Sequence, residues 1–238
     1  MKKAIVIGAS SGIGRELSKI LSKEGYIVGL VSRRIGLLHE LGDSLEGEYI
    51  VRRIDITDPE VSMNFLTELI EEMGGVDLVV ISSGVGNINE NLDWELENES
   101  IATNVVGFSA MANVAIKHFM QQKSGHLVGI SSVAALRGGK AAPAYNASKA
   151  YLSNYLEGLR QKITGLDGSI TITEIRPGFV DTAMAKGDGV FWVSSVEKAA
   201  KQIYSAIVSK KSCVYVTHRW LLVGWLLKIL PEAIYKRL

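Results

Sequence analysis

The sequence predicts an α/β protein: a doubly wound parallel sheet of about seven strands with helices on both faces. Short apolar runs alternate with longer segments of helical spacing along the chain, which is typical of parallel strands joined by helices. A glycine-rich turn joins the first apolar run to the first helical segment. No linker, internal repeat or low-complexity tract interrupts the 238 residues, so we expect one domain over residues 1–238.

Each strand is expected in a short apolar run, because a strand of a parallel sheet is buried on both faces. A run of this length bounded by turn residues is consistent with such a strand. The expected strands are, in order, KAIVIG, YIVGLVS, EYIVRRIDI, VDLVVISSG, HLVGISS, SITITEIRPG and CVYVT.

The segments between these runs carry helix signals. The first, SGIGRELSKILSKEG, places Ile13, Leu17 and Leu21 at helical spacing and ends at Gly25. In DPEVSMNFLTELIEEMGG, a proline lies near the first turn and glycines follow the last. The other expected helices are GLLHELGDSL, Asn98–Gln122, Tyr145 to about Lys162, and SSVEKAAKQIYSAIVSKK, capped by Ser194 or Ser195.

Composition excludes several classes of function. A formal net charge of +1 does not support a broad nucleic-acid surface. Cys213 is the only cysteine, which excludes an intrachain disulfide framework. The N-terminus lacks the long apolar core of a signal peptide. We expect a cytoplasmic protein with no metal site.

The turn VIGASSGIGRE has its glycines spaced G-x-x-x-G-x-G, directly after a strand and before a helix. Glycine allows a tight turn and a close approach of the backbone to a diphosphate. The helix N-terminus adds free N–H groups and a partial positive charge. We therefore expect a dinucleotide here, held by Gly8, Ser10, Ser11, Gly12, Ile13 and Gly14.

Two arginines follow the second strand in LVSRRI. An acidic residue at this place would favour a free ribose 2′-hydroxyl, whereas the guanidinium groups of Arg33 and Arg34 match the oxygens of a 2′-phosphate. Arg15 is expected to add charge. The arginines also fit a solvated surface, but the pattern favours NADP(H) over NAD(H).

The segment AYNASKAYLSNYLEGLR places Tyr145 and Lys149 four residues apart. On a helix such residues share one face, about 5–6 Å apart at Cβ. A nearby ammonium lowers the pKa of a phenol, which suits the phenol to acid–base chemistry. Small residues between the two leave room for a cofactor. Taken alone, the pair also fits an ordinary surface helix.

With these features in place, the chain resembles the short-chain dehydrogenase/reductase family, in its short, single-domain, NADP(H)-preferring form. The motifs GASSGIG, DIT, NVVG, ISS, YNASK and RPGFVDT occur in family order between about Ala4 and Val216. The resemblance implies a Rossmann-type fold. It also implies an NADP(H)-dependent oxidoreductase that interconverts an alcohol and a ketone or aldehyde by hydride transfer.

The resemblance also implies the roles of individual residues. Tyr145 corresponds to the catalytic acid/base. Lys149 corresponds to the residue that lowers the pKa of this tyrosine and holds the nicotinamide ribose. Ser132 corresponds to the serine that hydrogen-bonds the substrate oxygen, and Asn104 to the asparagine that anchors a water in the proton relay.

Further residues are implied to contact the cofactor. Asp55 corresponds to the residue at the adenine, and Ile56 would flank that ring. The residues implied to border the nicotinamide are Pro177, Gly178, Val180 and Thr182. The chain departs from the family at Ile81-Ser82-Ser83-Gly84, where Asn-Asn-Ala-Gly is usual, and Gly84 still permits backbone close to the cofactor. Gly129 likewise replaces a common asparagine.

Two segments bear on the substrate. Residues 183–193 lie where this fold carries its substrate loop, and Met184, Phe191 and Trp192 either line an apolar pocket or pack on the loop's own helix. The apolar tail, residues 219–238, is expected to be helical and is too short to span a bilayer, which needs about 20 apolar residues. We favour packing against protein, in which the tail either covers the cleft or contacts another subunit. The alternative is that the tail lies on a membrane surface as a peripheral anchor.

We expect a small-molecule alcohol or carbonyl substrate of hydrophobic character. The family commonly forms homodimers or homotetramers through its two long helices. Asn98–Gln122 and Tyr145–Lys162 are apolar enough for this, with Val105, Val106, Phe108 and Met111 on the first. The alternative function is a sensor or scaffold that binds NADP(H) without turnover.

Overall fold

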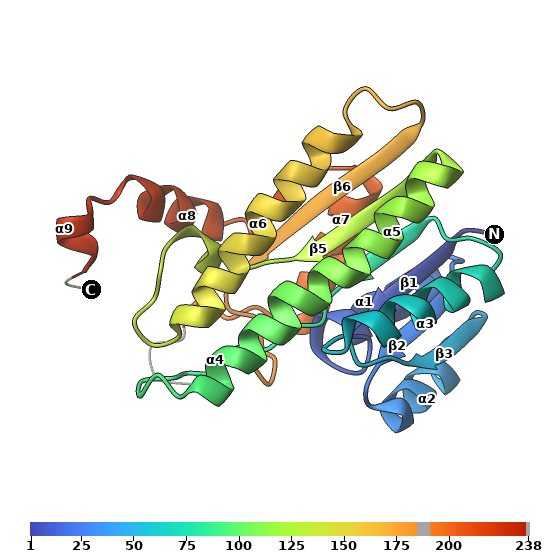
Figure 1. Cartoon of the computed structure of the whole chain (residues 1–238), viewed down its shortest axis with the longest axis horizontal. Coiled ribbons are helices and arrows are strands. Elements are labelled where there is room, and N and C mark those ends of the chain that lie inside the picture. The colour runs from blue at the N-terminus through green and yellow to red at the C-terminus, as the bar shows by residue number, and fades with distance from the viewer. Residues whose placement is uncertain (185–190, 237–238) are drawn as a thin grey trace.

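A parallel sheet forms the centre of the molecule (Figure 1). The computed structural model describes residues 1–184 and 191–236. Its strand order is β3-β2-β1-β4-β5-β6-β7, and every pair of neighbouring strands is parallel. The strands are β1 (Lys3–Ile7), β2 (Ile27–Ser32), β3 (Tyr49–Arg53), β4 (Leu78–Ile81), β5 (Ser124–Ile130), β6 (Ser169–Pro177) and β7 (Cys213–Val216).

The predicted fold class, a Rossmann-type doubly wound sheet of seven strands, is confirmed. The strand order reverses direction between β1 and β4, and in such sheets a crevice forms at this point, beyond the carboxyl ends of the strands. The helices are α1 (Gly12–Lys23), α2 (Ile35–Asp43), α3 (Pro59–Glu72), α4 (Trp94–Ile101), α5 (Phe108–Gln122), α6 (Pro143–Ile163), α7 (Val196–Val208), α8 (Trp220–Ile229) and α9 (Glu232–Tyr235).

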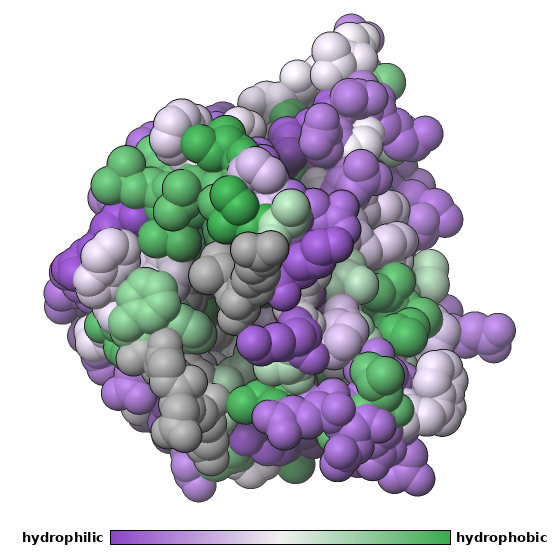
Figure 2. Space-filling model, turned by 90° about the vertical axis from the view of Figure 1, so that its left-hand side faces the viewer, coloured by the Kyte–Doolittle hydropathy of each residue, from purple (hydrophilic) through white to green (hydrophobic). Residues whose placement is uncertain are grey.

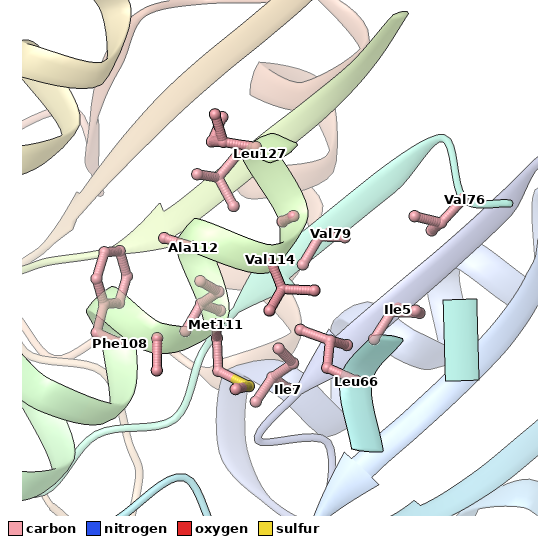
Figure 3. Packing of buried hydrophobic residues seen from close by; sticks show 14 of the residues in the cluster. Ile5, Ile7, Leu66, Val76, Val79, Phe108, Met111, Ala112, Val114 and Leu127 are labelled. Carbon is pink, nitrogen blue, oxygen red and sulfur yellow. The ribbon is translucent and has the colours of Figure 1, made fainter. Parts of the chain in front are cut away.

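Side chains alternate between the two faces of each strand, and this alternation builds two cores. Ile5 and Ile7 of β1 point to a cluster formed with α3, α5 and α6, where Phe108 and Met111 are buried (Figure 3). Ala4 and Val6 point to the opposite cluster, formed with α1, α2 and α7. Because both faces of the sheet are covered, β1, β2, β4 and β7 are mainly apolar, as expected, whereas β3 ends in two arginines and β6 carries Glu174 and Arg176.

The long helix expected over Asn98–Gln122 is interrupted. A π-helical segment, η1 (Ala102–Gly107), lies between α4 and α5. Such segments often mark functional sites. A Cβ on Gly107 would lie 2.5 Å from the carbonyl oxygen of Ile56, so this segment packs directly on the chain after β3.

One expectation about subunit contacts is wrong in part. Phe108 and Met111 are buried in the core and are not available to another chain. Val106 is exposed, and Tyr151 of α6 is also exposed and hydrogen-bonds Ser109 at 3.0 Å. The cap of α7 is Ser195, whose Oγ accepts a hydrogen bond from the Lys198 backbone N–H.

Candidate functional site

A cavity of about 1270 Å³ opens where the strand order reverses. Residues that follow β1, β2, β3, β4, β5 and β6 line it, and the C-terminal helices close one end. The cavity therefore lies at the carboxyl ends of the strands, where this fold is expected to bind ligands.

The glycine turn forms one wall of the cavity. Gly8 has a φ of +95°, and a Cβ there would lie 2.6 Å from the backbone nitrogen of Ser83, so a larger residue would not fit. Gly14 does not line the cavity, contrary to the expected contact. A Cβ on Gly14 would lie 2.3 Å from the carbonyl oxygen of Gly8, which shows that this glycine lets α1 pack against the turn.

The arginines after β2 differ in their contacts. Arg34 crosses to the glycine turn, where its Nη2 donates hydrogen bonds to Ser10 Oγ at 2.8 Å and to Ser11 Oγ at 2.6 Å. Arg33 is exposed at the rim of the cavity. Arg15 instead donates to the carbonyl of Leu37 and lies outside the cavity, so it does not add charge there as expected.

Asp55 and Ile56 follow β3 and line the next part of the wall. Asp55 Oδ1 accepts hydrogen bonds from the backbone N–H and the hydroxyl of Thr57, at 3.1 Å and 2.8 Å. This turn fixes the carboxylate at the cavity wall. Ile56 is buried beside it.

Ser132, Tyr145 and Lys149 come together in the wall of the cavity. Ser132 follows β5, and Tyr145 and Lys149 lie on successive turns of α6. The hydroxyls of Ser132 and Tyr145 are hydrogen-bonded to each other. Lys149 Nζ lies 5.7 Å from the centre of the Tyr145 ring and donates to the carbonyl of Ile130 at 3.2 Å.

Burial governs the protonation of this group. Burial raises the pKa of Tyr145, and the hydrogen bond with Ser132 opposes that rise. The expected lowering of this pKa by Lys149 stays a prediction. Burial also lowers the pKa of Lys149 to about 8. A pKa near this value leaves most of the amine charged at neutral pH.

Asn104 lies in η1 behind the cavity wall. Its amide donates hydrogen bonds to the carbonyl of Val85 and to Ser148 Oγ, and its oxygen accepts from the Val85 backbone N–H. Both amide hydrogens are thus used by the protein. The side chain ties η1 to the loop after β4 and to α6.

Two residues shape the site in ways that their sequence patterns did not predict. Asn146, next to Tyr145, donates from Nδ2 to the carbonyls of Ala134 and Arg137, which holds the loop after β5. A Cβ on Gly86 would lie 2.9 Å from the Tyr145 ring. Asn146 stands in the YNASK motif and was open to a sequence-based prediction, whereas the place of Gly86 depends on the course of the loop after β4.

The segment after β6 and the tail meet at one end of the cavity. Pro177, Gly178, Val180 and Thr182 line it, as expected for residues near a cofactor. A Cβ on Gly178 would lie 2.0 Å from the Trp220 ring, so this glycine admits the first residue of α8. The tail therefore covers the cleft, which was one of the open alternatives, and its lining residues are Trp220, Val223, Leu227, Glu232, Tyr235 and Lys236.

The expected substrate loop is described in part, because residues 185–190 lie outside the described residues. Met184 and Phe191 line the cavity. Trp192 packs against Trp220, with ring centres 6.2 Å apart. Met184 and Phe191 thus fit the pocket alternative, whereas Trp192 packs on the tail helix α8 and not on a helix of the loop.

Solved structures with this fold carry nicotinamide nucleotides. The chain superimposes on a short-chain dehydrogenase/reductase from Burkholderia phymatum in complex with NAD, with a TM-score of 0.84 and 21% identity over 94% of this chain and 92% of that one. A short-chain dehydrogenase from Sphingobium yanoikuyae in complex with NADPH gives a TM-score of 0.82 and 18% identity, covering 98% of each chain. At these identities the likeness establishes the fold, a Rossmann-like α/β fold.

Sequence comparison establishes the family. The family model for short chain dehydrogenase matches residues 2–189, and the chain belongs to this family of oxidoreductases. An uncharacterized oxidoreductase of Myxococcus xanthus is 37% identical over 188 residues, which are 77% of this chain and 74% of that protein. An uncharacterized oxidoreductase of Mycobacterium tuberculosis is 29% identical over 247 residues, covering 99% and 96% of the two chains.

Proposed function

We propose that the protein is an NADP(H)-dependent oxidoreductase that interconverts an alcohol and a ketone or aldehyde. The convergence of Ser132, Tyr145 and Lys149 in one cavity carries this proposal. Asn104 is the fourth member of the proposed set, as the residue that braces α6. Two hydroxyls and an ammonium suit a site where a carbonyl oxygen is polarised and protonated.

The cavity fits a dinucleotide. Gly8, Gly12 and Ser83 all line it, and Gly8 lets the turn after β1 pack closely on the backbone of Ser83. Ser83 Oγ is buried and has no hydrogen-bond partner within residues 1–184 and 191–236. Gly8, Gly12 and the first turn of α1 would hold the diphosphate. Arg33 and Arg34 would hold a 2′-phosphate, which favours NADP(H) over NAD(H).

When bound, the nicotinamide supplies the hydride for the carbonyl carbon. The Tyr145 hydroxyl donates its proton to the carbonyl oxygen, and Ser132 donates a hydrogen bond to the same oxygen as negative charge develops there. The Lys149 ammonium then favours the phenolate of Tyr145 until a proton returns from solvent. In the oxidative direction Tyr145 accepts the proton from the alcohol.

The substrate side of the cavity supports a hydrophobic carbonyl compound or alcohol. Apolar side chains, most of them from the segment after β6 and from α8, line part of the cavity, a composition that favours ligands of the same character. The residues that carry these side chains are Val85, Phe179, Met184, Phe191, Trp220, Val223 and Leu227.

The remaining expectations stay predictions. We propose one domain, a cytoplasmic location consistent with the single free thiol of Cys213, and a homodimer or homotetramer formed through the exposed parts of α4, η1, α5 and α6. None of the described helices is long and apolar enough to cross a bilayer.

To test this proposal, the protein is mixed with NADPH and each of a panel of hydrophobic ketones and aldehydes, and the loss of reduced-nicotinamide absorbance is measured. We expect turnover with NADPH, and a loss of about 10²–10⁴ in the Tyr145→Phe variant. NADPH affinity of that variant should match the wild type. NADPH binding without turnover on any compound would favour the sensor, and full turnover by Tyr145→Phe would overturn the assigned chemistry.

A further inference from the structure

Helix α8 is apolar on two opposite faces. The inner face contains Trp220, Val223, Gly224 and Leu227, at the i, i+3, i+4, i+7 spacing of one helix side. Trp220 and Gly224 are buried, and Val223 and Leu227 line the cavity. Packing against the cleft therefore explains why the inner face is apolar, but it does not explain the apolar outer face.

The outer face of α8 is largely exposed. We call it the tail face; it consists of Leu221, Leu222, Trp225, Leu226 and Ile229, all more than half exposed. Figure 2 shows apolar side chains gathered at the end of the molecule where α8 and α9 lie. A helix that is apolar all round is normally buried on all sides, and a contiguous exposed apolar patch marks an interaction site.

Basic and aromatic groups border the tail face. Arg219 precedes α8 and lies over the Trp192 ring, 5.7 Å from its centre, and Trp192 is itself half exposed. Lys228 lies in the last turn of α8. Among the described residues neither Arg219 nor Lys228 has a carboxylate within ion-pair distance, whereas Lys236 pairs with Glu232 at 3.9 Å.

This charge pattern selects among the possible occupants. A second copy docked on a two-fold axis would bring the same patch against itself and would bring like charges together. An anionic bilayer surface meets the basic residues with opposite charge, and each Lys or Arg near such a surface contributes about 1 kcal/mol. Exposed tryptophans such as Trp192 and Trp225 are typical of the membrane–water interface.

We propose that the tail face docks on an anionic phospholipid surface and anchors the protein as a peripheral membrane protein. The inner face of the same helix lines the cavity, so docking places the C-terminal end of the cleft next to the bilayer. The anchor does not depend on catalysis, and its test needs no substrate.

The experiment is flotation of the full chain with phosphatidylcholine vesicles, with and without phosphatidylglycerol. We expect flotation with the anionic vesicles, weakened by salt. A triple variant, Leu222→Gln, Trp225→Gln and Ile229→Gln, should lower the partition coefficient at least about tenfold. Trp94→Gln is the matched control, because Trp94 is 67% exposed and Trp225 is 64% exposed; it should float like the wild type.

Two further measurements distinguish contact of the tail face with lipid from contact with a second copy of the chain. Brominated lipid should quench the fluorescence of the wild type and of Trp94→Phe more than that of Trp225→Phe. Light scattering without lipid should give the triple variant and the wild type the same mass. A smaller mass for the triple variant would assign the face to a second copy. That result, or equal flotation of all variants, or no flotation at all, would overturn the proposal.

Discussion

The side-chain amide of Asn104 donates a hydrogen bond of 2.9 Å to Ser148 Oγ, and so joins η1 to α6 between Tyr145 and Lys149. Ser148 in turn donates to the carbonyl of Tyr145 at 2.7 Å. Both Asn104 and Ser148 are buried. The helix that carries the two proposed catalytic residues is thus fixed from behind by a polar contact that does not line the cavity wall.

Removal of this contact should destabilise the fold. In Ser148→Ala an amide hydrogen of Asn104 loses its partner in a buried place, and we expect unfolding free energy to fall by about 1–3 kcal/mol. Urea titration measures the loss. Ser205→Ala, an exposed serine within α7, is the matched control and should change stability little. Equal stability of the two variants would show that the contact is not needed.

The loop after β4 positions the Tyr145 ring. A Cβ on Gly86 would lie 2.9 Å from two ring carbons of Tyr145 and 3.2 Å from Met184 Sδ. Gly86→Ala should therefore displace the ring and lower kcat, while NADPH affinity stays near the wild-type value. Gly138→Ala lies in the same cavity and has open space for its Cβ. Similar kcat values for the two variants would contradict this role.

The arginines after β2 should set cofactor preference. Arg34 already lies against Ser10 and Ser11 of the glycine turn, with Arg33 beside it at the rim. Loss of charge-assisted hydrogen bonds in the double variant Arg33→Ser, Arg34→Ser should raise the Kd for NADPH by about 10–100-fold. The Kd for NADH is the internal control and should change much less. A parallel weakening of both cofactors would show general damage to the turn.

The sequence predicted the sheet well because its signals are local. Most strands are short apolar runs, and the turn at Gly8 stands between a strand and a helix. The relative position of Tyr145 and Lys149 was predictable for the same reason, because residues four apart on a helix lie on the same face. Ser132 was placed by its order within the family motifs.

Features that depend on distant contacts were not predictable. Asn104, in the π-helical segment, forms side-chain hydrogen bonds with Val85 and Ser148, which lie far away in sequence. The hydrogen bond between Ser132 and Tyr145 also joins residues from separate elements, so the spacing within α6 could not predict it. Gly14 shares the spacing of the cofactor glycines, yet it serves the packing of α1.

His126 should make stability depend on pH. This buried residue of β5 bonds Thr173 Oγ1 through Nε2 at 2.8 Å. Burial, helped by the positive charge of Lys210, lowers the pKa of His126 from 6.5 to about 4. The unfolded chain therefore binds more protons between these values, and stability is lost as pH falls from about 6.5 towards 4.

For His126 alone we expect a loss of about 2 kcal/mol between pH 7.5 and pH 5. Urea titrations at the two pH values measure it. His126→Gln should show a smaller loss over this range, whereas His39→Gln, which removes an exposed histidine, should lose as much as the wild type. If His126→Gln and His39→Gln respond alike, His126 is not the source of the pH dependence.

Glu174 forms a buried ionic cluster in β6. Its side chain is fully buried and accepts hydrogen bonds from Ser131 next to Ser132, from Ser153 of α6, and from Arg176 at 2.8 Å and 2.9 Å. Burial acts to raise the pKa of Glu174, but the hydrogen bonds and the charge of Arg176 lower it overall. The cluster links the strand end that carries Ser132 to the helix that carries Tyr145.

Glu174→Gln removes the charge opposite Arg176 and keeps the side-chain shape. The Arg176 guanidinium, which is partly buried, would lose its partner, and we expect a loss of up to about 3–5 kcal/mol in unfolding free energy at neutral pH. Because the pKa of Glu174 is lowered on folding from 4.5, the carboxylate stabilises the fold above that pH and its contribution is lost as pH falls below it. The difference in unfolding free energy between wild type and variant, measured by urea titration, should therefore shrink at acid pH.

The control is Glu72→Gln, which breaks an exposed pair with Arg52 and should cost about 0–1 kcal/mol. A loss at Glu174 no larger than this would show that the buried pair adds no net stability.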